Sequence, residues 1–221
     1  MSKVVNPFSH RLGILRDWRH RWFANGPAYQ QNLKGDILLR EFLQRELHGQ
    51  YVGGLEIERG KVLRVIIKTS RPGLIIGRSG EGSKNLRDKI DKFLRKHKVP
   101  VPEIKLDIEE VRSPESNAAI VATMVAEGLE KRLPFRRVLK QTIEKVMANR
   151  DVKGVRIVIS GMLGAGSMSR TEGLKKGRIP LQTFRADVDF ARERANLPLG
   201  VIGVKVWIYK GDVFTKDGKD A

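Results

Sequence analysis

Two glycines three residues apart, Gly77 and Gly80, stand between the apolar tripeptide 74–76 and a segment of helical periodicity that runs to about Lys96. Glycine lets the backbone turn sharply and come close to a ligand. The helix that follows presents free N–H groups and the positive end of its dipole. Arg78, between the glycines, adds a guanidinium group. The pattern therefore predicts a loop that clamps a phosphate-bearing backbone.

The residues around this loop predict a defined order of elements. Residues 36–48 have an approximate apolar helix face, with Asp36 as a plausible N-cap. Residues 55–58 and 104–108 alternate between apolar and polar, and residues 62–67 are rich in β-branched side chains, so all three segments are predicted as strands. The predicted order is helix, strand, strand, short helix, glycine-rich loop, helix and strand.

The second half of the chain predicts another α/β unit. Two helices are expected over about 118–132 and 134–149, separated by Pro134. Four strands are expected after them, and the alternation of apolar residues is strongest in the last one. These strands lie at 155–159, 168–175, 181–191 and 201–209. The predicted unit is thus two helices packed on a sheet of about four strands.

The charge of the chain indicates a polyanionic partner. There are 43 Lys and Arg against 25 Asp and Glu, which gives a net charge of +18 and a pI near 10.4. The surplus is spread along the sequence and is heaviest, at +10, in residues 111–210. An excess of this size favours nucleic acid, and broad phosphate contact predicts binding that weakens steeply with salt.

The composition also excludes several classes of protein. The absence of cysteine excludes disulfides, thiolate catalysis and cysteine-bound metals. No run of eighteen apolar residues and no secretory core at the N-terminus are present, so a cytoplasmic protein is expected. The four histidines are scattered, and the adjacent carboxylates Glu109 and Glu110 point to opposite faces of a strand. We therefore expect no enzyme activity, no cofactor and no metal.

Residues 1–35 are predicted to be an irregular arm in which aromatic and basic side chains alternate. Trp18, Trp22 and Phe23 lie among Arg16, Arg19, His20 and Arg21. Two interpretations stay open, since these rings can dock the arm onto the core or stack on bases beside the arginines.

Several longer strings resemble one protein family. The strings are Arg11-Leu12-Gly13, Trp22-Phe23-Ala24-Asn25, Arg71-Pro72-Gly73 through Gly80-Glu81, Phe135-Arg136-Arg137, Ser160-Gly161, Arg170-Thr171-Glu172, Gly177 to Leu181, Arg185-Ala186-Asp187 and Gly200 to Ile208. Together they resemble the bacterial small-subunit ribosomal protein number three, which is built around a type II KH domain. The resemblance covers about residues 3–212.

The resemblance implies an α+β fold in four parts. An N-terminal arm (1–35) precedes a type II KH domain of α-β-β-α-α-β order (36–111). A C-terminal α/β ribosomal domain (112–210) and a polar tail (211–221) follow. KH domains use a Gly-x-x-Gly loop to hold a nucleic-acid backbone.

The resemblance also implies a role. The family sits in the head of the small ribosomal subunit, binds rRNA, neighbours ribosomal proteins ten and fourteen, and lines the channel through which mRNA enters. The matching mRNA-binding positions are Arg136, Arg137 and Lys140, and the alternative for these three is an ordinary solvated helix face. The KH loop comprises Gly77, Arg78, Ser79, Gly80 and Lys84. The rRNA-contact candidates are Arg11, Arg16, Arg19, Arg21, Arg170, Lys175, Lys176, Arg178 and Arg185.

The chain departs from the family pattern at the KH loop. Many relatives carry two basic residues between the glycines, but only Arg78 stands there in this chain. Either the loop holds a nucleic-acid backbone more weakly than in those relatives, or Lys84 supplies the second cation.

Three other functions fit the sequence less well. Residues 77–84 approach a P-loop, but Ser83 and Lys84 are transposed relative to the Gly-Lys-Ser order that phosphate and Mg²⁺ binding require. The glycines at 161, 164 and 166 reverse the dinucleotide-binding order and are predicted to form a turn. A free-standing KH protein of transcription or RNA maturation is the remaining alternative, and the C-terminal strings argue against it.

Overall fold

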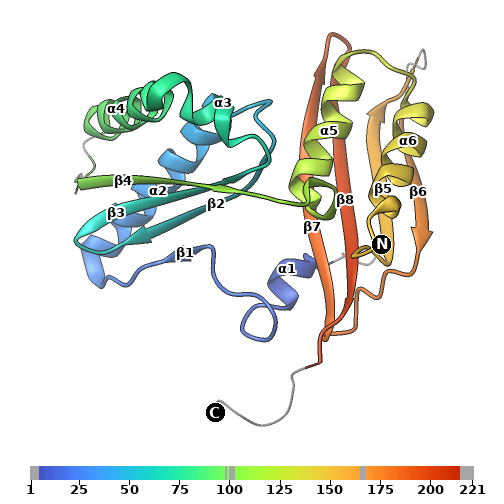
Figure 1. Ribbon diagram of the computed structural model, residues 1–221, viewed down its shortest axis with the longest axis horizontal. Helices are drawn as coiled ribbons and strands as arrows, with labels where there is room; N and C mark the ends of the chain where they lie inside the picture. The colour runs from blue at the N-terminus through green and yellow to red at the C-terminus, as the bar shows by residue number, and fades with distance from the viewer. Residues whose placement is uncertain (1–4, 98, 100–102, 165–167, 215–221) are drawn as a thin grey trace. The chain divides into compact units, whose positions relative to one another are not determined.

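The computed structural model describes residues 5–97, 99, 103–164 and 168–214, and it separates the chain into two compact units (Figure 1). Residues 18–112 form one unit, called here the central unit. Residues 1–17 and 113–221 form the other, called the split unit because it combines the two ends of the chain. The residues predicted as one arm, 1–35, are therefore divided between the two units.

The central unit has the predicted element order around the glycine-rich loop. Its elements are β1 (His20–Arg21), α2 (Gly26–Glu46), β2 (Val52–Arg59), β3 (Val62–Thr69), α3 (Pro72–Ile76), the 3-10 turn η1 (Arg78–Gly80), α4 (Glu81–Lys96) and β4 (Glu103–Glu110). The sheet order is β1-β2-β3-β4. Strands β2 and β3 are antiparallel, whereas β4 lies parallel to β3 and forms an edge of the sheet. The predicted α-β-β-α-α-β fold is confirmed.

Helix α2 corrects one prediction, because it begins at Gly26 rather than at residue 36. Pro27 lies in its first turn, where a missing N–H costs nothing. The first half of the helix is largely exposed and has no apolar stripe, so periodicity could not reveal it. Asp36 is not an N-cap but a mid-helix residue, 5% exposed, whose carboxylate pairs with Arg59 at 2.6 Å.

The core of the central unit comes from one face of its sheet and two helices. Helix α2 contributes Leu39 and Leu43, and helix α4 contributes Ile90 and Leu94. They pack with buried strand residues such as Ile57, Val65 and Ile67. The apolar face of α4 that the sequence predicted is therefore the face that positions the glycine-rich loop above the sheet.

The split unit is a two-layer α/β structure. Its elements are α1 (Pro7–His10), the 3-10 turn η2 (Pro114–Ser116), α5 (Ala118–Glu130), α6 (Phe135–Ala148), β5 (Gly154–Met162), β6 (Ser169–Gly177), β7 (Ala186–Leu197) and β8 (Gly200–Asp212). The four strands are antiparallel in the order β6-β5-β8-β7. Both long helices lie over the same face of this sheet (Figure 1). Two helices on a four-stranded sheet confirm the predicted C-terminal architecture.

The third strand of this sheet lies further along the chain than predicted. Strand β7 covers residues 186–197, not 181–191. The alternation at 181–185 belongs to a connection whose carbonyl groups at Leu181 and Thr183 accept hydrogen bonds from the buried Arg11. The strand extends to residue 197 because β8 supplies hydrogen-bonding partners along that length.

Apolar clusters lie on both faces of the split-unit sheet. The helix-covered face holds the main core, which includes Ile157, Val204 and Val206. A smaller cluster on the opposite face includes Val188, Trp207 and Tyr209. In the described part of the chain, no helix is both long and apolar enough to cross a bilayer.

Candidate nucleic-acid interface

The glycine-rich loop has a backbone that glycine favours. Gly77 has φ +68° and Gly80 has φ +79°, both in the left-handed region. The connection is tight, because a Cβ on Gly82 in the first turn of α4 would lie 2.6 Å from the carbonyl oxygen of Ile75. Ser79 also has a positive φ of 55°. The backbone therefore turns sharply between α3 and α4, as the Gly-x-x-Gly spacing predicted.

The loop is exposed but only moderately basic. The side chains of Arg78 and Lys84 are exposed, and neither forms an ion pair with a described residue. Gly80 is the N-cap of α4, and the hydroxyl of Ser83 donates a hydrogen bond to its carbonyl at 2.8 Å. Glu81 occupies the first helical turn and offsets part of the positive dipole. The loop suits contact with one or two phosphates.

Helix α6 concentrates positive charge at its N-terminal end. Arg136, Arg137 and Lys140 are exposed, whereas Val138 and Leu139 between them are buried in the core. No acidic residue stands in the first turn of the helix. Cations at a helix N-terminus are unfavourable for the helix itself, since the dipole there is already positive. The arrangement is therefore suited to an anionic ligand.

The fold brings Arg170 of β6 to the same end of α6. The guanidinium carbons of Arg136 and Arg170 lie 5.6 and 5.5 Å from the ring centroid of Phe135. Glu172 lies 3.6 Å from Arg136 and 3.7 Å from Arg170. The ring and the carboxylate hold the two guanidinium groups in one cluster.

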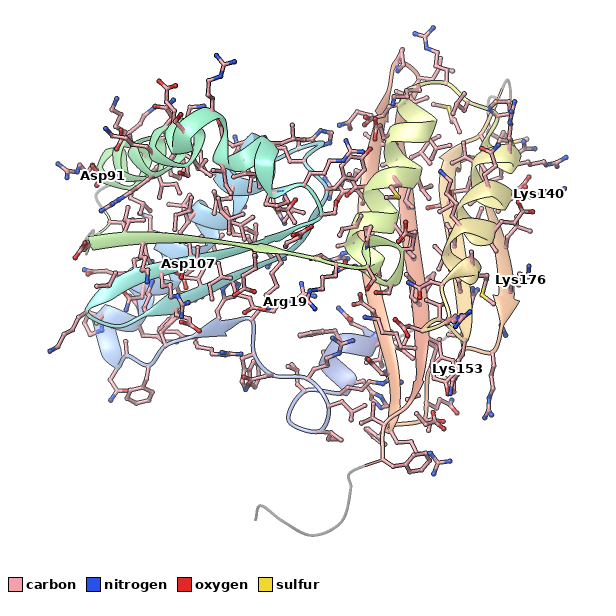
Figure 2. The ribbon with its side chains drawn as sticks, in the orientation of Figure 1. Arg19, Asp91, Asp107, Lys140, Lys153 and Lys176 are labelled. Carbon is pink, nitrogen blue, oxygen red and sulfur yellow. The ribbon has the colours of Figure 1, made fainter. Side chains whose placement is uncertain are left out.

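Lys176 adds a further cation on the helix-covered side of β6. It pairs in the sheet with Val155, whose side chain belongs to the helix-covered core. Figure 2 labels Lys176 on β6 and Lys140 on the neighbouring α6. The sequence did not suggest the contribution of Phe135 and Glu172, although Phe135 directly precedes the arginine pair.

Arg11 was predicted to contact rRNA, but the structure buries its side chain. Its side chain is 0% exposed and donates hydrogen bonds to five backbone carbonyls. Burial lowers the pKa of its guanidinium group below the ordinary value. A side chain enclosed in this way does not reach RNA, and four of its five hydrogen bonds tie the N-terminal segment to residues 180–186, at the start of β7. Arg16 is also engaged, in an ion pair with Asp187 at 2.5 Å.

The other predicted cations lie at separate places. Arg178 and Arg185 are exposed near Asp212, and Arg185 lies 3.4 Å from its carboxylate. Lys175 points to the face of the split-unit sheet opposite Lys176, because neighbouring strand residues alternate. In the central unit, Arg19 precedes β1 and Arg21 ends it, with Arg21 3.4 Å from Glu58.

The aromatic residues of the N-terminal segment differ in exposure: one ring docks onto the core, as the first interpretation expects, and two remain exposed, as base stacking requires. The indole N–H of Trp22 donates a hydrogen bond to the Asp36 carboxylate at 2.6 Å, so this ring docks the segment onto helix α2. Burial lowers the pKa of the neighbouring His20 imidazole. Phe23 is 87% exposed and Trp18 is 64% exposed, which leaves both rings accessible for stacking.

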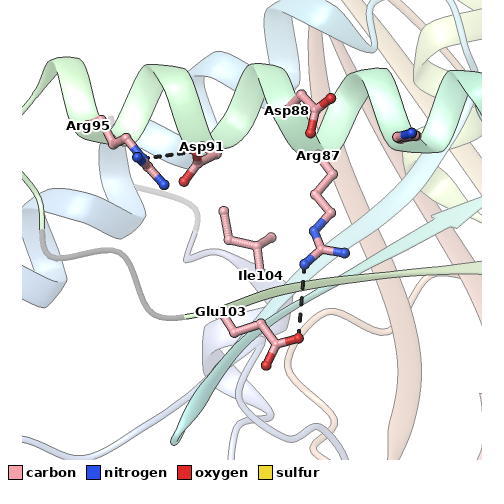
Figure 3. Close-up of a pocket in the computed structure, with 7 residues that line it drawn as sticks. Arg87, Asp88, Asp91, Arg95, Glu103 and Ile104 are labelled. Carbon is pink, nitrogen blue, oxygen red and sulfur yellow. Dashed lines mark ion pairs between the residues drawn. The ribbon is translucent and has the colours of Figure 1, made fainter.

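A groove of about 480 Å³ between α4 and β4 carries balanced charge (Figure 3). Arg95 pairs with Asp91 at 2.9 Å, and Arg87 lies 4.0 Å from Glu103. Most of its charged groups thus neutralise one another. Among the described residues, no group of three or more histidine or acidic side chains is arranged to hold a metal.

Comparisons with known proteins identify both parts of the chain. A family model described as a KH domain matches residues 38–116, and one described as the ribosomal protein S3 C-terminal domain matches residues 125–208. The chain is therefore a KH-domain RNA-binding protein. Relatives named small ribosomal subunit protein uS3 match nearly its whole length. One from Caldicellulosiruptor saccharolyticus is 41% identical and covers 100% of this chain and 97% of its own.

Two further relatives give the same result. The protein of that name from Coxiella burnetii is 43% identical over 96% of this chain and 91% of its own. The one from Blochmanniella floridana is 41% identical over 98% and 89%. The chain belongs to the small ribosomal subunit protein uS3 family. This is a structural, non-enzymatic family, so the prediction that the chain is not an enzyme is confirmed by its relatives.

Proposed function

We propose that this chain is a structural constituent of the small ribosomal subunit that binds rRNA in the lower part of the subunit head. We further propose that helix α6 grips mRNA where it enters the subunit, with the cytoplasm as the place of action. The observation that carries the mRNA role is the exposed cluster of Arg136, Arg137 and Lys140 at the positive end of α6.

Charge and geometry support this use of α6. Arg136 and Lys140 are four residues apart and share one helix face. Arg137 and Lys140 form no ion pair with any described residue, so both cations are available for phosphates. Residues that lower the stability of a helix terminus while remaining exposed fit a binding role better than a packing role. Arginine adds bidentate contacts to phosphate.

The rRNA contacts are proposed for other surfaces. The KH loop, with Arg78 and Lys84, is shaped to approach a sugar–phosphate backbone. The exposed cations Lys175, Lys176, Arg178 and Arg185 extend the basic surface of the split unit. Ribosomal proteins ten and fourteen are proposed as protein neighbours on the strength of the family resemblance alone.

The mRNA role is tested by the double variant Arg136→Ala with Arg137→Ala in reconstituted small subunits. We expect subunits to assemble at wild-type yield but to translate more slowly through a stable mRNA hairpin than through an unstructured message. The matched control is Lys92→Ala with Lys96→Ala, which removes two exposed cations of α4. Wild-type speed through the hairpin in assembled variant subunits is the result that rejects the role.

The rRNA role of the KH loop needs a separate measurement. Footprints of small-subunit rRNA with the wild-type chain and with Arg78→Gln plus Lys84→Gln identify the nucleotides that the loop protects. Nucleotides that the wild-type chain protects and the variant does not protect support the assignment of the loop to rRNA. Identical footprints show that the loop does not contact rRNA.

A further inference from the structure

The face of the split-unit sheet that α5 and α6 leave uncovered has an unusual composition. Residues paired directly across strands point to the same side of a sheet. Lys175, Arg156, Trp207 and Phe190 therefore form one row across β6, β5, β8 and β7. The next row is Gly173, Val158, Lys205 and Arg192, and Arg194 follows on β7. We call these nine residues the helix-free face.

This orientation is confirmed by side-chain contacts. The rings of Phe190 and Trp207 are 5.1 Å apart, and the guanidinium carbon of Arg156 lies 5.3 Å from the Trp207 ring centroid. Val158 packs against the same cluster. The intervening residues, such as Val204 and Val206, belong to the core beneath the helices.

Five cations occupy the helix-free face without a carboxylate between them. The side chains of Lys175, Arg156, Lys205, Arg192 and Arg194 are all exposed. None of them forms an ion pair with another residue in the described ranges. The nearby carboxylates, Asp187 and Asp212, lie toward the end of the sheet, and both are engaged by other arginines. The face therefore carries uncompensated positive charge.

The aromatic residues give this face a second property. Phe190 is half-buried, so part of its side chain remains in contact with solvent. Trp207 is 7% exposed under the Arg156 guanidinium, and its indole N–H has no hydrogen-bond partner among the described residues. Gly173 has no side chain to rise above the sheet surface, and an added Cβ would lie 2.9 Å from the side chain of Val158. A strand glycine of this kind suits close approach of a ligand.

We propose that the helix-free face is a further RNA-binding surface, separate from helix α6 and from the KH loop. Phosphates bind Arg156, Lys205 and Arg192, and an unpaired base stacks on Phe190. Cations beside accessible rings on an open sheet suit single-stranded RNA, because every base offers a flat face. This inference takes from the proposed function only that the ligand is RNA.

The test is binding of the full chain to fluorescein-labelled oligouridine, measured by anisotropy across a salt series. The variant is Arg156→Gln, Arg192→Gln and Lys205→Gln. The matched control, Lys61→Gln, Lys92→Gln and Lys96→Gln, removes the same charge from exposed residues of the central unit. Each phosphate contact contributes about 0.7 to the slope of log K against log salt, so the variant slope falls by about 2. The control slope stays at the wild-type value.

Two further variants separate charge from packing. The charge-keeping variant Arg156→Lys, Arg192→Lys and Lys205→Arg retains the wild-type slope. Phe190→Ala keeps the slope and weakens binding about fivefold, because a stacked base contributes about 1 kcal/mol or more. Circular dichroism of each variant verifies the fold.

The outcomes also distinguish this inference from the proposed function. Arg136→Gln, Arg137→Gln and Lys140→Gln are combined in a parallel variant. A slope lowered only in that variant supports helix α6 and overturns the helix-free face. A slope lowered only in the helix-free-face variant does the reverse. If the helix-free-face variant and the charge control behave alike, the inference is wrong, and an acidic protein surface becomes the better candidate partner for this face.

Discussion

Arg11 is predicted to be the main attachment of the N-terminal segment to the split unit. Its side chain is fully buried and donates hydrogen bonds to five backbone carbonyls, four of which lie 169 to 175 positions away in sequence. The acceptors are the carbonyl oxygens of Ala186 at 2.5 Å, Pro7 and Thr183 at 2.9 Å, Leu181 at 3.1 Å and Pro180 at 3.3 Å. Arg11→Met keeps much of the side-chain length but removes every donor.

The size of the effect follows from the burial of these hydrogen bonds. The bonds to Ala186 and Pro7 are buried, so their carbonyls lose a charged donor that water does not readily replace. The other three bonds are partly exposed, and water substitutes for the guanidinium there. An unsatisfied buried acceptor costs about 1–3 kcal/mol, so two of them cost about 4 kcal/mol. For a unit of this size, that lowers the melting temperature by about 10–20 °C.

The assay is thermal unfolding of the full chain together with hydrogen exchange of β7 amides. We expect Arg11→Met to lower the transition of the split unit and to speed exchange in β7. Arg11→Lys is expected to fall between wild type and Arg11→Met, because an ammonium group has three donors for five acceptors. Arg178→Met removes an exposed arginine and changes stability by no more than about 0.5 kcal/mol. Wild-type melting and β7 protection in Arg11→Met would refute the reasoning.

Three further predictions concern other contacts. Gly82→Ala places a methyl group 2.6 Å from a backbone carbonyl oxygen, so the central unit loses about 1–3 kcal/mol in urea unfolding; an unchanged midpoint contradicts this. Asp36→Asn leaves the buried guanidinium of Arg59 without its charged partner and costs about 3–5 kcal/mol by the same assay; a wild-type midpoint shows that the ion pair does not stabilise the unit. The Tyr209 hydroxyl donates to Asp212 and thereby lowers the pKa of that carboxyl. Tyr209→Phe raises the Asp212 pKa toward its ordinary value, as NMR titration measures. In the wild type, this hydrogen bond contributes its full stability above the ordinary carboxyl pKa. That contribution is lost as the pH falls through the lowered pKa of Asp212, so the variant is less stable than the wild type only at the higher pH. An unshifted Asp212 titration counts against that hydrogen bond.

The elements that the sequence predicted well share a local signal. Helix α4 carries apolar residues at the helical period and strand β3 is rich in β-branched residues, and both appear close to where they were expected. The turn between Gly77 and Gly80 was predictable because positive φ angles favour glycine. The excess of cations along the chain predicted a nucleic-acid partner without any structural knowledge.

The elements that were missed or misplaced lack such a signal. The first half of helix α2 has no apolar stripe because it is largely exposed. The short strand β1 pairs with β2 through only two residues, so it leaves no periodic pattern. The start of β7 was misplaced because the alternation in 181–185 is produced by packing within a connection rather than by a strand.

The sequence by itself determined the order of the elements, the glycine turn, the family and the class of ligand, because each depends on residue type and local spacing. Tertiary structure alone decided which cations are available to RNA. Arg11 bonds to the carbonyl of a residue 175 positions away and is lost to binding, while Arg170 joins Arg136 around Phe135. Arg156 and Arg192 reach one face only through strand register. Exposure and pairing of a charge depend on long-range contacts, which local sequence does not encode.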